Sequence, residues 1–214
     1  MTVNLVNYTK VLKKNTVLDN VNCTFNSGNI YGLSGRNGCG KTMLLRAVAG
    51  LILPTKGYAS IDNKIIGKDI EFPPSVGLII ENMNMPTEYT ALKNLQLLAK
   101  INNIATEDDI KNALIAVGLD ANDKRTVKKF SLGMKQKLNI AQAIMEKPKI
   151  LLLDEPTNAL DVESVKLVHQ ILLKFKKEDS LIIIASHNKN DLNGICDVII
   201  NIEAGRINSI EENY

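Results

Sequence analysis

The sequence predicts one domain of the α/β class, with a mixed, largely parallel sheet, an N-terminal antiparallel β portion and an all-helical insert. Two continuous apolar runs, 150–153 and 181–185, are typical of parallel strands that are buried on both faces. These runs alternate with segments of helical spacing, as they do in α/β proteins. A length of 214 residues is enough for one large domain that contains an insert.

The first part of the chain, up to about residue 82, has the pattern of strands joined by turns. The strands expected here are 2–8, 16–25, 30–34, the two arms of a hairpin within 56–67, and 76–80. The hairpin is expected to turn at 61–64. Residues 43–52 predict a helix that stops before Pro54, because proline cannot continue a helix.

Between about residues 83 and 130 the pattern changes to helices alone. Segments 90–104 and 106–119 have helical spacing, and each begins with a threonine that can cap the helix. We therefore predict a core made of about 1–82 and 131–214, with 83–130 as the helical insert.

From residue 131 onward the chain returns to alternating helices and strands. The helices expected here are 131–147, 162–177 and a short one at 189–195, and the strands are 150–154, 181–186 and 197–203. Pro148 ends the first of these helices. Strands that alternate with helices indicate a parallel sheet.

The charge balance gives little indication of a nucleic-acid partner. The 26 lysines and arginines exceed the 23 acidic residues by only three, a net charge of +3. The most basic stretch contains Lys124, Arg125, Lys128, Lys129, Lys135 and Lys137. We interpret this stretch as a solvated face, with a docking surface as the alternative. We expect no nucleic-acid partner.

Targeting and redox signals are weak throughout the chain. Three scattered cysteines do not make a disulfide framework, and the first residues lack the apolar core of a signal peptide. No apolar run approaches the roughly 18 residues that a membrane span requires. We therefore expect a cytosolic chain, which would need a membrane partner to act on a membrane process.

The strongest local motif is GRNGCGKT at 35–42, which lies after an apolar strand and before a helix. In this context its glycines allow backbone N–H groups to surround phosphate oxygens, at the positive end of the helix. We expect Lys41 to reach the β- and γ-phosphates of ATP and the Thr42 hydroxyl to bind Mg²⁺. The candidate nucleotide-binding residues are Gly35, Arg36, Asn37, Gly38, Cys39, Gly40, Lys41, Thr42 and Met43.

Two acids follow the apolar strand at 150–153. Asp154 is placed at the carboxyl end of this strand, where open α/β sheets bind ligands, and can hold Mg²⁺ directly or through water. Glu155 is the candidate general base that activates the attacking water. The alternative is a pair of surface acids without chemistry.

A histidine follows the apolar strand at 181–186. A single histidine is more often structural, but at the end of a parallel strand beside a phosphate loop His187 is a candidate contact for the γ-phosphate. We interpret the other histidine, His169, as a flanking surface residue of a helix.

The segment FSLGMKQK at 130–137 begins a helix with a serine and a glycine. Ser131 is a good N-cap residue, and a hydroxyl beside exposed N–H groups at a helix start makes an anion site. The chain's own phosphates already have a loop at 35–42. A second phosphate-binding surface therefore favours a site that serves the nucleotide of another chain.

These motifs in this order resemble the ABC (ATP-binding cassette) ATPases over essentially the whole chain. Ser131 and Gly133 match the serine and second glycine of the family signature, whereas Leu132 and Met134 depart from it. Residues 158–161 are similar to the family's D-loop, and His187 matches its switch histidine. The resemblance implies a head-to-tail dimer that binds two ATP molecules, each between the phosphate loop of one chain and the signature of the other.

Two further positions depart from the family pattern. Glu81 stands where the family has a glutamine that senses Mg²⁺ and contacts the membrane partner. Leu12 stands where the family stacks an aromatic ring on adenine, with Tyr8 four residues earlier. The signature, Glu81 in its segment and a short chain that ends near the last strand resemble the bacitracin-resistance and lantibiotic-immunity exporters, which implies a separately encoded integral membrane permease.

The resemblance implies a Mg²⁺-dependent ATPase subunit of an exporter, bound to the inner face of the membrane through its permease. Three alternatives remain at this point. A cassette without transport would bind soluble partners, a catalytically weak regulatory cassette would turn over little ATP, and a small-molecule kinase would not need Ser131 or Gly133.

Overall fold

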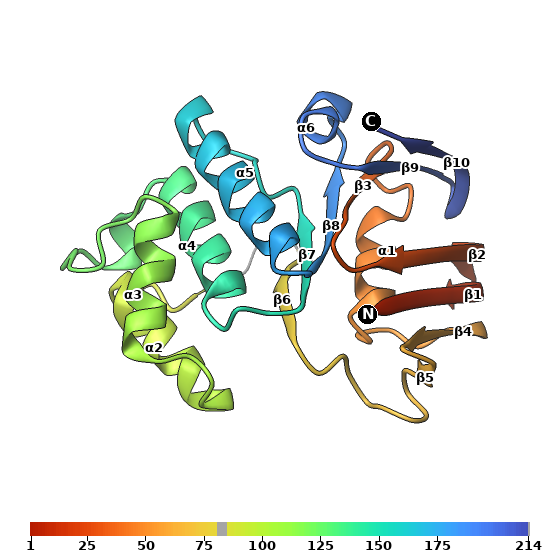
Figure 1. Cartoon of the computed structure of the whole chain (residues 1–214), viewed down its shortest axis with the longest axis horizontal. Helices are drawn as coiled ribbons and strands as arrows, with labels where there is room; N and C mark the ends of the chain where they lie inside the picture. The colour runs from red at the N-terminus through yellow and green to blue at the C-terminus, as the bar shows by residue number, and fades with distance from the viewer. Residues whose placement is uncertain (81–84, 214) are drawn as a thin grey trace.

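A computed structural model describes residues 1–80 and 85–213 and contains two sheets (Figure 1). The larger sheet has six strands in the order β10-β9-β3-β8-β7-β6. Its strands are β3 (Ile30–Ser34), β6 (Val76–Ile79), β7 (Ile150–Asp154), β8 (Leu181–Ser186), β9 (Val198–Glu203) and β10 (Arg206–Glu212). Only β10 runs antiparallel to its neighbour, so this sheet is mixed and largely parallel, as predicted.

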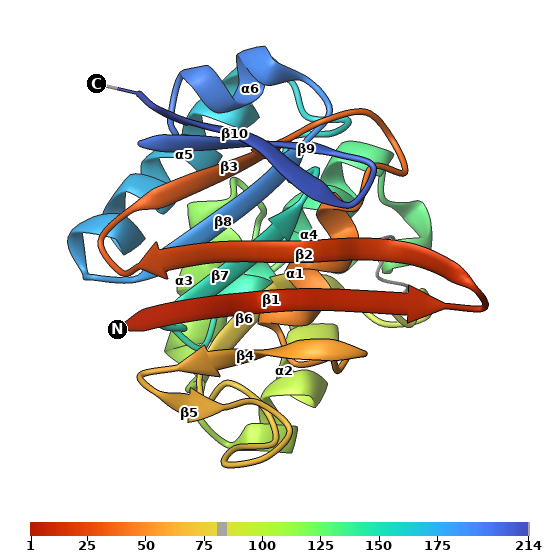
Figure 2. The same ribbon diagram turned by 90° about the vertical axis from the view of Figure 1, so that its right-hand side faces the viewer.

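The smaller sheet is antiparallel and comes from the first third of the chain (Figure 2). Its strands are β1 (Thr2–Leu12), β2 (Asn15–Asn26), β4 (Lys56–Ile61) and β5 (Lys64–Ile65), in the order β2-β1-β4-β5. The hairpin between β4 and β5 turns at Asp62 and Asn63, both with left-handed φ angles (46° and 66°). This is the two-residue turn expected within 61–64.

The helices lie on both sides of the larger sheet (Figure 1). They are α1 (Lys41–Val48), α2 (Ala91–Asn102), α3 (Glu107–Ala116), the 3₁₀ turn η1 (Val127–Lys129), α4 (Leu132–Ile144), α5 (Val162–Lys177) and α6 (Lys189–Asn193). Within the described residues, none of them is long and apolar enough to cross a membrane. The helices α2 and α3 lie at the end of the molecule farthest from the antiparallel sheet (Figure 1).

Two hydrophobic cores flank the larger sheet because side chains alternate along each strand. On β7, Leu151 and Leu153 join the core formed with α2 to α5, whereas Ile150 and Leu152 join the core formed with α1 and the antiparallel sheet. Both faces of the strand are therefore apolar. This explains the uninterrupted run at 150–153 from which a buried parallel strand was predicted.

The predicted α/β class is confirmed, with differences at particular elements. The edge strand β10 was not predicted, because its sequence is mostly polar and one of its few apolar side chains, Ile210, is 55% exposed. The first helix ends at Val48, several residues before Pro54. The threonine caps were predicted correctly, since the hydroxyl oxygens of Thr90 and Thr106 accept hydrogen bonds from the first turns of α2 and α3.

The cap of α3 predicts an acid-sensitive contribution to stability. Asp109 accepts hydrogen bonds from Thr106 and pairs with Lys147 (2.6 Å). Lys147, followed by the Thr106 bonds, lowers the pKa of the Asp109 carboxyl well below its usual range. A lowered pKa stabilises the fold above the unfolded-state value of about 4, and this stabilisation is lost as the pH falls through the folded-state value.

We expect Asp109→Asn to lower the free energy of unfolding by about 1 kcal/mol at pH 7, as loss of a capping contact does. The difference from the wild-type chain should shrink as the pH falls below about 4. Urea unfolding at several pH values measures it. Asp108→Asn, at the exposed neighbouring position, is the control, and an equal effect of the two variants would contradict this assignment.

Candidate active site

The order of the parallel strands brings three loops of the chain to one edge of the larger sheet. Strands β3 and β7 both pair with β8, so that Ser34 lies opposite Ser186 and Asp154 lies opposite Ala185. The loops that follow these strands therefore start side by side. They carry the phosphate loop, the acid pair and His187, the arrangement expected at the carboxyl ends of strands in an open α/β sheet.

The phosphate loop has the geometry that an anion site requires. Gly38 and Gly40 have left-handed φ angles (78° and 117°), and the space around a Cβ at Gly38 is open to 4 Å. Gly40 is the N-cap of α1 and provides no side-chain cap, so the first N–H groups of the helix remain available to a ligand. Lys41 is buried, and its Nζ donates to the Gly35 (2.7 Å) and Arg36 (3.2 Å) carbonyls.

The two predicted metal ligands of the loop and of β7 meet. The Thr42 hydroxyl donates to Oδ2 of Asp154 (2.5 Å). A hydroxyl and a carboxylate are hard oxygen donors of the kind that Mg²⁺ prefers. Within residues 1–80 and 85–213, no group of three or more His, Cys, Asp or Glu side chains is suited to a metal ion. Mg²⁺ sites built on one or two protein ligands are completed by phosphate and water, and the pair fits this type.

Glu155 is held by the end of β8. Its backbone has a left-handed φ of 50°, and its N–H donates to the Ala185 carbonyl (2.9 Å). Its Oε1 accepts from the His187 N–H (2.9 Å) and lies 2.7 Å from His187 Nδ1, whereas its Oε2 accepts from the Ser186 hydroxyl (3.3 Å). The structure thus brings the candidate base and the candidate histidine into direct contact.

The phosphate loop and the acids line one cavity of about 490 Å³. Its lining residues are Asn15, Thr16, Val17, Asn37, Gly38, Gly40, Lys41, Thr42, Met43, Asp154, Glu155, Ala204 and Gly205. Eight of them were predicted. Asn15, Thr16, Val17, Ala204 and Gly205 were missed, although a glycine two residues after the strand at 197–203 is a recognisable turn signal.

Leu12 and Tyr8, the two positions considered for adenine, have different environments. Leu12, at the end of β1, is 40% exposed and is not among the described residues that line this cavity. Tyr8 is fully buried, its hydroxyl donates to the Ile52 carbonyl (2.7 Å), and burial raises its pKa. Tyr8 therefore cannot stack on a base. The start of β2, with Asn15, lines the cavity instead.

The turn between β9 and β10 is hydrogen-bonded to the phosphate loop. The Gly205 N–H donates to the Cys39 carbonyl (2.8 Å), and the Gly205 carbonyl accepts from the Asp19 N–H (2.9 Å). Arg206 adds an ion pair with Asp19 (2.6 Å). Gly205 has a φ of 79°, and a Cβ there would lie 2.8 Å from the Val17 carbonyl oxygen. This turn therefore ties the loop to β2.

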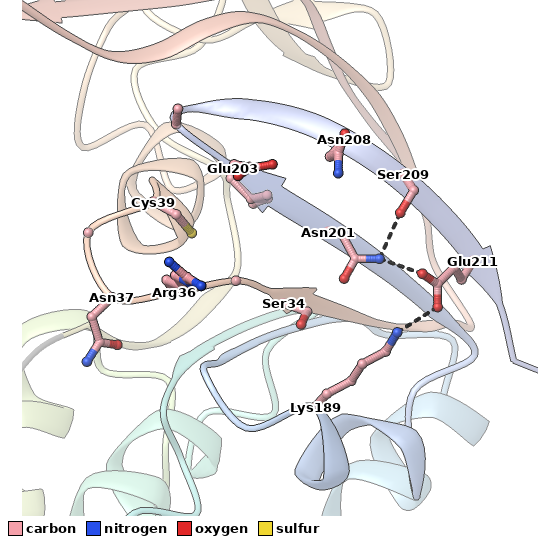
Figure 3. A pocket seen from close by; sticks show the side chains of 14 residues that line it. Ser34, Arg36, Asn37, Cys39, Lys189, Asn201, Glu203, Asn208, Ser209 and Glu211 are labelled. Carbon is pink, nitrogen blue, oxygen red and sulfur yellow. Dashed lines mark hydrogen bonds and ion pairs between the residues drawn. The ribbon is translucent and has the colours of Figure 1, made fainter.

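A second cavity, of about 600 Å³, lies between the phosphate loop and the strands β9 and β10 (Figure 3). Three predicted nucleotide residues, Gly35, Arg36 and Cys39, line it rather than the first cavity. Its far wall comes from α6, β9 and β10, where Lys189 pairs with Glu211 (2.9 Å). Asn37 and Gly38 line both cavities, so the two adjoin each other at the phosphate loop.

The signature segment, residues 130–137, does not line the cavity formed by the phosphate loop and the acids. Ser131 is exposed and caps α4, as predicted, because its hydroxyl oxygen accepts from the Met134 N–H (3.2 Å). A Cβ at Gly133 would lie 2.8 Å from the Ala159 carbonyl oxygen, so the segment packs against the loop that follows β7. Neither Ser131 nor Gly133 lines the described cavity of its own chain. The remaining predicted metal residue, Glu81, lies outside the described residues.

Residues 18–158 match the sequence profile of the family described as ABC transporter. The chain belongs to the ABC transporter family. It is 54% identical to an uncharacterized ABC transporter ATP-binding protein, YybJ of Bacillus subtilis (strain 168), over 98% of this chain and 96% of that protein. It is 37% identical to the bacitracin transport ATP-binding protein BcrA of Bacillus licheniformis, over 93% of this chain and 66% of that protein.

A solved structure shows the same fold. The dimeric structure of MJ0796, a bacterial ABC transporter cassette, superimposes with a TM-score of 0.89 at 24% identity and covers 99% of both chains. The expected α/β cassette fold and the predicted family resemblance are therefore confirmed. Membership of the ABC family makes this chain a nucleotide-binding cassette and an ATPase, and the bacitracin relative agrees with the predicted subgroup.

The turn at Gly205 can be tested by adding one methyl group. Gly205→Ala places a Cβ against the Val17 carbonyl in a left-handed conformation, which costs about 1–2 kcal/mol for the backbone alone. We expect a lower melting temperature and weaker ATP binding, measured with a fluorescent ATP analogue. Gly194→Ala, where a Cβ meets nothing within 4 Å, is the control. If both variants bind ATP like the wild-type chain, the turn does not support the loop.

Proposed function

We propose that this chain is the ATP-hydrolysing subunit of an ABC exporter, which works as a head-to-tail dimer on a separate membrane permease. The observation that carries the proposal is the division of the phosphate-binding groups within one chain. The phosphate loop and the acids share a cavity, whereas the start of α4, with Ser131, is exposed outside it. In this proposal, the groups at the start of α4 bind the phosphate of a nucleotide that is held by another copy of the chain.

In this proposal the residues of the loop bind the phosphates of ATP. The buried Lys41 ammonium exchanges its loop carbonyls for phosphate oxygens, and the uncapped start of α1 donates its N–H groups. Thr42 and Asp154 hold Mg²⁺, which when bound draws negative charge from the phosphates. Asn37, Gly38 and Met43 complete the inner wall. Gly35, Arg36 and Cys39, which line the second cavity, maintain the shape of the loop.

Glu155 is the proposed general base, and His187 orients it. Two oxygens of one carboxylate are bound to the end of β8, so the side chain is fixed before a nucleotide arrives. On ATP binding the His187 ring would turn from Glu155 to the γ-phosphate, which frees one oxygen to accept a proton from water. The distance of 2.7 Å between His187 Nδ1 and Glu155 Oε1 supports this proposed switch of the ring from the carboxylate to the phosphate.

The partner copy would supply Ser131 and Gly133 to this nucleotide. The exposed N-cap hydroxyl and the first turn of α4 can donate to a γ-phosphate. Leu12, which pairs with Asn15 of the cavity wall, and the start of β2 would contact adenine by apolar packing rather than by stacking. Stacking on an aromatic ring is worth about 1–3 kcal/mol per base in related settings, so we propose weaker selection for adenine.

The helical insert is the proposed docking site for the permease, with Glu81 as a Mg²⁺-sensing and coupling residue. Its α2 region carries large apolar side chains that face solvent, among them Leu97 (37% exposed), Ile101 (74%) and Ile104 (60%). Clustered exposed apolar side chains are typical of protein contacts. Through this contact the chain would lie in the cytoplasm at the inner face of the membrane.

The catalytic assignment is tested by Glu155→Gln. The amide keeps the size of the side chain but cannot take a proton, so we expect turnover to fall about 100-fold or more. ATP should still bind, and the variant should accumulate as an ATP-bound dimer that size-exclusion chromatography separates from the monomer. Glu163→Gln, at an exposed position of α5, is the control for the charge change. Turnover at the wild-type rate would remove Glu155 from this role.

The docking assignment is tested by a pull-down from native cells in mild detergent, followed by mass spectrometry. We expect one polytopic membrane protein at stoichiometric yield with the wild-type chain. Ile101→Glu should lose this partner while ATP binding is unchanged, whereas Ile210→Glu, on the exposed side of β10, should keep it. Recovery of soluble partners alone would favour a cassette without transport.

A further inference from the structure

A glutamine of α4 contacts the backbone that carries the candidate base. The side-chain Nε2 of Gln136 donates to the carbonyls of Glu155 (3.2 Å) and of Pro156 (3.0 Å). Gln136 is partly buried, so these bonds are shielded from competing water. Its two amide hydrogens are matched by two carbonyl acceptors on consecutive residues, an arrangement that fixes the direction of that backbone.

The contacted loop needs external support because its backbone is strained. Glu155 and Ala159 have left-handed φ angles of 50° and 62°, which residues with a Cβ rarely adopt. Such conformations persist where surrounding contacts determine them. Inside the loop, the Glu155 carbonyl accepts only a long bond from the Asn158 N–H (3.3 Å). The bonds from Gln136 are therefore an important part of what holds the loop.

Two further contacts place the same loop. Gly133, one turn before Gln136, lies so close to Ala159 that a Cβ there would meet its carbonyl oxygen at 2.8 Å. From the opposite side, the Thr157 hydroxyl donates to Asp191 of α6 (3.3 Å). The first turns of α4 and the loop that follows β7 consequently form one packed unit.

We propose that Gln136 is a positioning residue for ATP hydrolysis, which holds the Glu155 backbone so that the carboxylate faces the attacking water. This inference rests on the proposed role of Glu155. Gln136 is not among the described residues that line the cavity of the phosphate loop and the acids. Its place on α4 adds a consequence, because Ser131 at the start of that helix faces the nucleotide of the partner in the proposed dimer. A movement of α4 on nucleotide binding at one site would be transmitted through Gln136 to the base of the other site.

Three substitutions separate hydrogen bonding from packing. Gln136→Glu has the same shape but opposes a carboxylate to two carbonyls, and Gln136→Leu removes both donors without adding charge. Gln136→Lys keeps a donor that can reach both carbonyls. We expect the first two variants to lower kcat at least ~10-fold, because small displacements of a catalytic group have large effects. The Kd for ATP should stay within about twofold, and Lys should restore part of kcat.

A double variant tests whether Gln136 acts through Glu155. If it does, Gln136→Leu should lower the residual rate of a Glu155→Gln chain by less than about twofold, since effects of residues that act as a unit do not add. A purely structural role would lower the rate by the same factor in both backgrounds. Gln170→Leu, an exposed glutamine of α5, is the matched control and should leave both rates unchanged.

Hydrogen exchange measures how firmly the loop after β7 is held, and it does not require ATP turnover. In Gln136→Leu, the amides of residues 157–161 should exchange faster than in the wild-type chain, whereas those of α5 should not change. Unchanged exchange and unchanged kcat would overturn the inference. If the loop loosens but the wild-type chain hydrolyses no ATP, the proposed function fails and only the structural contact of Gln136 stands, so the two failures are distinguishable.

Discussion

The parallel pairing of β3, β8 and β7 is the arrangement on which the whole site depends. Because the three strands end at the same level, Ser186 lies beside Ser34 and Ala185 beside Asp154. The Ala185 carbonyl then accepts the Glu155 N–H, which sets the direction of the chain as it leaves β7. A shift of β7 by one residue would turn Asp154 away from Thr42, since successive side chains point to opposite faces. Two apolar cores, one on each face of the sheet, hold this register.

The loop after β7 is the point where the larger sheet meets α4 and α6. It is bound by the end of β8 through His187, by α4 through Gln136 and by α6 through Asp191. Each contact comes from a different segment of the chain. A backbone with two left-handed residues, Glu155 and Ala159, is kept in place by this combination rather than by local preference. Movements of α4 or α6 therefore reach the candidate base directly.

The elements that could be predicted are those specified by a pattern within a few residues of the sequence. The buried strands, the threonine caps and the phosphate loop could be predicted because apolar runs, capping residues and glycine spacing are visible over a few residues. Contacts between distant segments carry no such pattern, and Gly205 beneath the phosphate loop and Gln136 behind Glu155 were missed for this reason. Leu12 was placed by counting along a hairpin, and counting could not show that the tight turn at Lys13–Lys14 brings the start of β2 to the cavity.

The separation of the two phosphate-binding surfaces gives the proposed dimer its dependence on ATP. In that proposal, Lys41 and the start of α1 would bind the phosphates of ATP from the cavity of one chain. The terminal phosphate would then extend toward the exposed start of the partner's α4, whose first N–H groups favour negative charge. ADP lacks this group, so the attraction between the two copies falls when the phosphate is cleaved and released. In such a dimer, hydrolysis with Glu155 as the base removes the phosphate that holds the two copies together. The reaction therefore opens the site in which it takes place.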